Sequence, residues 1–143
     1  MVPSRPKPGA GRSADTFCRK LLAEKENSEA LTWLKQSRAG DIRTLGEQNP
    51  SDSLKMVEEI YNSGAIKANI IDIERVAGYG ETSNVVCVEM PAAPEQRRKL
   101  FQIESRMATS AGFDPVADDG QTYLFLSNFK LSFGQMLRAP FHF

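Results

Sequence analysis

The side chains in this sequence that could carry out chemistry are few and widely separated. Cys18 and Cys87 lie far apart and belong to no C-x-x-C pair, and His142 is the sole histidine. A nucleophile–histidine pair or a metal site needs several such groups held close together. The sequence therefore predicts no catalytic residue, no bound metal and no cofactor.

Carboxylates and one thiol are the reactive groups that an enzyme of this sequence would have to use. Asp72 and Glu74 are spaced closely enough for acid–base catalysis, although solvent-exposed positions explain such a pair equally well. In this alternative, the protein is a small cytoplasmic enzyme whose cleft lies beside a sheet and uses carboxylates or Cys87. An exposed, acidic Cys87 whose alkylation stops turnover would favour it.

Residues 78–83, with the sequence G-Y-G-E-T-S, come closest to a phosphate-binding loop. A dinucleotide-binding fingerprint needs a third glycine and then a helix, so that the phosphate meets the helix amino terminus. Ser83 stands where that glycine would be, and a strand pattern follows it. We therefore expect Gly78 and Gly80 to form the tip of a β-hairpin.

Two further charged groups invite a ligand hypothesis. Asp114, Asp118 and Asp119 share one loop, but their spacing misses the calcium-binding pattern and no glutamate closes it. A turn at Asp119 and Gly120 explains that loop more simply. The basic residues 97–99 are typical of a solvent-exposed helix face, with an anion site as the alternative.

The elements that would position these groups are shown by the apolar pattern of residues 52–126. Its period changes from about 3.6 to 2, back to 3.6 and again to 2, which predicts helix, hairpin, helix and strand. Pro50 and Gly64 bound the first helix, and Pro94 and Gly112 bound the second. A short strand over residues 41–47 would precede them.

This order resembles the split β-α-β arrangement of ferredoxin-like domains, over residues 41–127. The resemblance implies an α+β fold, in which two helices cover one face of a four-stranded antiparallel sheet. RNA-recognition domains share this topology, but here the first and third strands lack the aromatic residues that stack on bases. The layout is also similar to ACT-type modules, which implies a small-ligand sensor as a second alternative.

The remaining segments flank this domain. Residues 1–13 have the composition of a disordered basic tail, and residues 14–40 are predicted to form a helical hairpin. Residues 128–143 form an aromatic-rich carboxyl-terminal tail with more large apolar groups than a solvated tail would carry. The tail would pack on its own domain or on a partner.

The charge balance restricts the class of partner. Eighteen basic and eighteen acidic residues cancel, so no global field attracts nucleic acid or an acidic membrane. No apolar run is long enough to cross a membrane. Two unpaired cysteines are typical of the reducing cytoplasm, where we expect this protein to act.

Together these observations predict a small soluble protein-interaction or regulatory module without catalytic activity. Its partner would be another protein or a second copy in a homodimer, and a small ligand is also compatible with the sequence. The proposed contact surface has two parts, the mixed face of the hairpin and the aromatic tail. Its candidate residues are Lys67, Asn69, Cys87, Glu89, Phe129, Phe133 and Phe141.

Overall fold

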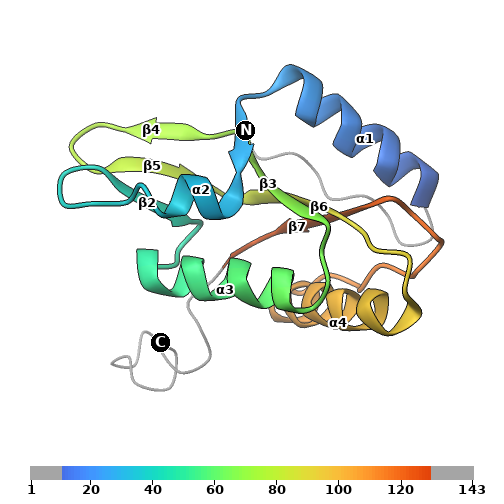
Figure 1. The fold of residues 1–143 in the computed structure, drawn as a ribbon. Coiled ribbons are helices and arrows are strands. Elements are labelled where there is room, and N and C mark those ends of the chain that lie inside the picture. Colours follow the sequence, from blue (N-terminus) through green and yellow to red (C-terminus); the bar gives the residue numbers. More distant parts are fainter. Residues whose placement is uncertain (1–10, 130–143) are drawn as a thin grey trace.

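The structure, a computed structural model, describes residues 11–129 and has an α+β fold in that range, as predicted. Helices and strands alternate along the chain and form two sheets (Figure 1). In chain order the elements are α1 (Gly11–Glu24), β1 (Asn27–Glu29), α2 (Ala30–Leu34), β2 (Ile42–Leu45), α3 (Pro50–Asn62), β3 (Lys67–Ile71), β4 (Glu74–Val76), β5 (Gly80–Ser83), β6 (Val85–Glu89), α4 (Pro94–Ser110) and β7 (Tyr123–Ser127).

The large sheet is antiparallel and has the strand order β1-β3-β6-β7. Figure 1 shows α3 and α4 on one of its faces, as the sequence predicts. Because successive side chains of a strand point to opposite faces, every second residue of β3, β6 and β7 reaches the core on this side. The sheet residues of that core are Ala68, Ile70, Val86, Val88, Leu124 and Leu126.

A second, smaller core lies on the opposite face of the large sheet, under α1. Cys18 and Leu21 of α1 pack there against alternate residues of β3, β6 and β7. This helix also holds the start of β7, since the Asp15 carboxylate accepts hydrogen bonds from the amides of Thr122 (2.9 Å) and Tyr123 (2.8 Å). The large sheet is therefore covered on both faces.

The small sheet has the order β2-β5-β4 and projects beyond one end of the large sheet (Figure 1). Its strands β2 and β5 are parallel, whereas β4 and β5 form an antiparallel hairpin. The sequence predicts a hairpin tip over residues 74–83. A turn does lie there, with the Tyr79 amide bonded to the Val76 carbonyl (3.0 Å), but most of the segment is strand.

The ferredoxin-like strand order is not shown. That order would place residues 42–45 at the centre of the large sheet, between two other strands. Instead β6 pairs directly with β7, and β2 pairs with β5. The physical reason is β5 itself, because it offers β2 an edge that the sequence analysis had assigned to a loop.

Gly80 allows this pairing. Its φ is +147°, and a Cβ at this position would lie 2.0 Å from the Ile42 carbonyl oxygen. No side chain fits between the two strands at that distance. The parallel pairing of β2 and β5 therefore requires glycine at residue 80.

The helical hairpin expected over residues 14–40 is interrupted by β1. The Asn27 side chain donates to the carbonyls of Leu22 (2.8 Å) and Lys25 (3.0 Å), which turns the chain away from α1. Asn27–Glu29 then pairs with β3, and α2 follows as a helix of only five residues. The two helices do not form a pair, because α1 packs on the second core and α2 on the main core, on different faces of the large sheet.

Candidate functional site

The hairpin residues predicted as a contact surface share one face of the large sheet. The strand register places Lys67 opposite Glu89 and Asn69 opposite Cys87. Lys67 is exposed and Asn69 and Glu89 are partly buried, but Cys87 is completely buried under α1. A partner could therefore reach three of these residues and not the thiol.

Phe129 is also buried, with 1% of its surface exposed. Its amide donates to Asn84 Oδ1 (3.0 Å), and its carbonyl accepts from the Glu47 amide (2.9 Å). Phe129 thus closes the main core beyond β7 and presents no free aromatic surface. Phe133 and Phe141 lie outside the described residues, so the role of the tail stays a prediction.

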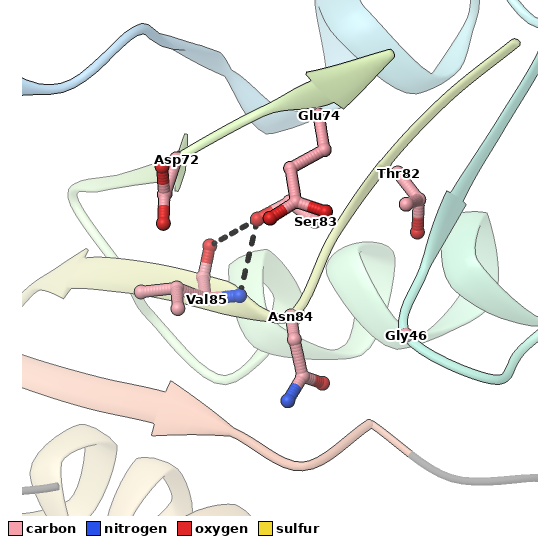
Figure 2. Close-up of a pocket in the computed structure, with 7 residues that line it drawn as sticks. All are labelled: Gly46, Asp72, Glu74, Thr82, Ser83, Asn84 and Val85. Carbon is pink, nitrogen blue, oxygen red and sulfur yellow. Dashed lines mark hydrogen bonds between the residues drawn. The ribbon is translucent and has the colours of Figure 1, made fainter. Parts of the chain in front are cut away.

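A small pocket of about 180 Å³ lies where the two sheets meet. Figure 2 shows its carboxylates, Asp72 and Glu74, on the segment that enters β4. Asp72 has a φ of +56°, a conformation that aspartate adopts more readily than most residues. The pocket is lined by Gly46, Asp72, Glu74, Thr82, Ser83, Asn84 and Val85.

Ser83 lines this pocket, and its side chain is held by hydrogen bonds to the backbone. Its Oγ accepts from the Val85 amide (3.1 Å) and donates to the Ile71 carbonyl, so it joins the ends of β3 and β6. The lining has two carboxylates and no basic side chain. It suits a small cationic group and is smaller than the pockets that hold drug-sized ligands.

A metal site is not formed by the residues that the structure describes, since they contain no cluster of three or more histidine, cysteine or acidic side chains. None of the helices in residues 11–129 is long and apolar enough to span a membrane.

The two edges of the small sheet differ sharply. At the β2 edge, the Arg43 amide donates to Ser37 Oγ (2.9 Å) and the Leu45 amide to Ser53 Oγ (2.8 Å). These serines occupy the backbone groups that another strand would need. The β2 edge is therefore closed.

The β4 edge is open. Every residue of Glu74–Val76 is exposed, and β4 ends the strand order of its sheet in the described part of the chain. In an antiparallel pair, every second residue of an edge strand directs its N–H and C=O outward. Val76 (42% exposed) adds apolar surface on this edge strand, whereas Tyr79 in the following turn reaches the other way, with its hydroxyl 3.3 Å from Thr44 Oγ1 of β2.

One face of the small sheet is attached to α2 by polar contacts. Glu81 accepts a hydrogen bond from the Trp33 indole (2.9 Å) and pairs with Arg43 (3.5 Å) and Arg75 (3.2 Å). The Arg43 guanidinium also lies over the Trp33 ring, 5.8 Å from its centroid. These side-chain contacts attach the small sheet to α2, and none of them uses a backbone group at the outer edge of β4.

The anion site considered for residues 97–99 is not favoured by the contacts of Arg97. Its guanidinium binds both Asp118 oxygens (2.7 and 3.1 Å) and the carbonyls of Pro91 and Gln121. The hydrogen bonds from Arg97 lower the pKa of Asp118. This arginine therefore anchors the loop before β7, and four of its five guanidinium N–H groups are occupied.

Comparison of the chain with protein-family models, curated proteins and solved structures finds no match. The function has to be inferred from the geometry alone.

The open edge was not predicted, because residues 74–83 were interpreted as one long loop. A signal was present, since V-A-G-Y-G places a short glycine-containing turn between two runs of extended character. The pocket could not be found this way, because its residues come from three stretches of the chain that only the fold brings together, residues 46, 72–74 and 82–85.

Glu29, the last residue of β1 in the large sheet, joins α2, α3 and β3. Its carboxylate caps α2 through the amides of Leu31 (3.0 Å) and Thr32 (2.9 Å) and accepts from the Tyr61 hydroxyl (2.6 Å). That hydroxyl in turn accepts from the Ala68 amide (3.0 Å). Partial burial opposes ionisation, but the hydrogen bonds outweigh it and lower the pKa of Glu29 to about 2.

We expect this carboxylate to make stability depend on acid. A lowered pKa in the folded state means that the contribution is complete above the ordinary value of 4.5 and is lost as the pH falls toward about 2. After allowance for solvent screening, about 1–2 kcal/mol should disappear in that window. Urea unfolding between pH 6 and 2.5 measures the loss.

The Glu29→Gln variant is the control, because it keeps an acceptor at the helix start and cannot titrate. Its stability should vary less with pH than that of the wild type over the same window. Equal slopes for the two proteins would show that Glu29 is not the group responsible.

Proposed function

We propose that this chain is a protein-interaction module that binds an extended segment of a partner protein along β4. The observation that carries the proposal is the contrast between the two edges of the small sheet. Ser37 and Ser53 close the β2 edge, whereas the residues of β4 are all exposed. An open edge strand is a template on which another strand can pair.

The chemistry around β4 indicates the kind of segment that it would bind. Main-chain hydrogen bonds would supply affinity, and Val76 would pack on an apolar side chain of the segment. Asp72 and Glu74 line the adjacent pocket without a basic neighbour among its lining residues. Charge complementarity therefore favours an extended segment with lysine or arginine opposite Glu74 and, two residues away on the same face, an apolar residue opposite Val76.

The cytoplasm is the compartment that we propose for this interaction, because both cysteines in the described residues are unpaired thiols. A second copy of the chain could also pair along β4. That arrangement would place Glu74 opposite Val76 and Arg75 opposite its own copy, and the second of these pairs is repulsive. We therefore favour a basic partner segment over a homodimer.

The proposal can be tested with a fluorescein-labelled decapeptide in which lysine and valine alternate at every second position, with threonine between them, so that one face of the strand carries both kinds of residue. We expect its anisotropy to rise on addition of the full chain, and the amide resonances of residues 74–76 to shift in NMR spectra. The Glu74→Lys variant should weaken binding at least tenfold, because it places a like charge opposite the peptide. The change lies on an exposed side chain, so the fold should be retained.

Glu58→Lys is the matched control, since Glu58 is exposed on α3 and the change in net charge is the same. It should bind the peptide like the wild type. Equal weakening by both variants, or shifts that map away from β4, would overturn the proposal. A concentration-dependent dimer in sedimentation equilibrium that Glu74→Lys alters would replace the partner segment with a second copy.

A further inference from the structure

We propose that Cys18 and Cys87 form a redox-controlled latch that can tie α1 covalently to the large sheet. This inference is independent of the β4 interaction. It assigns a role to two residues that are distant in sequence and that the fold brings together.

The two thiols meet in the small core beneath α1. Cys18 lies on α1 and Cys87 lies within β6, and neither has any exposed surface. Both belong to the same cluster of apolar side chains, with Leu21 and Phe125 beside them. Both are free thiols in the structure. They are therefore neighbours across the helix–sheet interface.

The other attachments of α1 show what the latch would add. Asp15 binds the amides at the start of β7, and the Phe17 and Phe125 rings pack with their centroids 5.4 Å apart. These contacts run from α1 to β7. A Cys18–Cys87 bond would instead connect α1 to β6, at the centre of the sheet.

While α1 is packed on the large sheet, both thiols are protected from oxidants. The hydrogen bond to Cys87 and burial raise the pKa of Cys18 well above its usual value, so little of it is the reactive thiolate. Oxidation therefore requires α1 to lift briefly from the sheet. The latch would close when an oxidant arrives during such an opening.

A hydroperoxide is the oxidant that we propose. During an opening the Cys87 thiolate attacks one peroxide oxygen, so that an S–O bond forms, the O–O bond breaks and hydroxide leaves. As α1 packs back, the Cys18 thiol attacks the Cys87 sulfur and gives its proton to the departing hydroxide, so that the S–S bond forms, the S–O bond breaks and water leaves. The two thiols lose two protons and two electrons, and one hydrogen peroxide becomes two waters.

The test compares the reduced full chain with the same protein after treatment with hydrogen peroxide. We expect an intact mass lower by two hydrogens and a peptide pair joined through Cys18 and Cys87. Amide hydrogen exchange within α1 should slow about tenfold, because the bond suppresses its local opening. A thiol reductant should reverse both changes.

Cys18→Ser separates the two chemical steps. This variant should form no intramolecular disulfide and should accumulate a sulfenic acid at Cys87 that dimedone traps. The latch would be excluded if the folded wild type forms only intermolecular disulfides, or forms the bond only in denaturant. An unchanged exchange rate of α1 in the oxidised wild type would also exclude it, and this comparison requires no mutation.

Discussion

Replacing Phe129 with alanine should lower the free energy of unfolding by about 3–5 kcal/mol. The side chain is 1% exposed and packs against the main core, so its removal leaves a cavity in addition to lost apolar contact. Its backbone bonds to Asn84 and Glu47 do not need the ring and should remain. Urea unfolding followed by circular dichroism measures the change.

Phe113→Ala is the matched control, because it makes the same truncation at a ring that is 47% exposed. We expect a loss of about 1 kcal/mol or less at this position. The pair tests whether Phe129 belongs to the core or to a partner surface. If both variants lost equally little, the placement of Phe129 as a core residue would be wrong.

Gly80→Ala should disrupt the small sheet while the large sheet remains folded. The added Cβ would lie 2.0 Å from the Ile42 carbonyl oxygen and 2.4 Å from the Ile42 nitrogen, both of them backbone atoms that cannot rotate away. We expect the parallel pairing of β2 and β5 to be lost, at a cost of about 3 kcal/mol. Hydrogen exchange should show faster exchange in β2 and β5 and little change in β3 and β6.

Gly78→Ala provides the comparison at the neighbouring glycine. Gly78 has a φ of +76°, but no atom lies within 4 Å of the position where a Cβ would be added. Backbone strain alone should then cost about 1–2 kcal/mol. Equal effects of the two substitutions would show that the close approach of Ile42 is not the cause.

Much of the fold follows from the local pattern. The helices α3 and α4 and the pairing of β3 with β6 are found where the apolar periods and the flanking prolines and glycines predict them. The strand order does not follow from the local pattern, because it depends on which strand edges are available for pairing as the chain folds. Residues 74–83 were predicted to contain no strand, so the only edge expected to pair with β2 was one in the large sheet. In the structure β2 pairs with β5 instead.

For the predicted contact residues, the shared face could be predicted from the sequence, but their burial could not. The alternation of β6 correctly places Cys87 and Glu89 on the same face, and the register brings Asn69 opposite Cys87. That α1 buries Cys87 could not be inferred, because an amphipathic helix indicates that it will cover some face and not which one. The meeting of Cys18 with Cys87 depends on the same unknown.

The contact of Trp33 with Glu81 has a practical consequence. The chain contains one tryptophan, and its indole lies between α2 and the small sheet, bonded to a residue of β5 and covered by Arg43. Tryptophan fluorescence from the unlabelled protein therefore comes from this single junction. The sequence thus carries its own optical reporter of whether the small sheet is attached to the rest of the molecule.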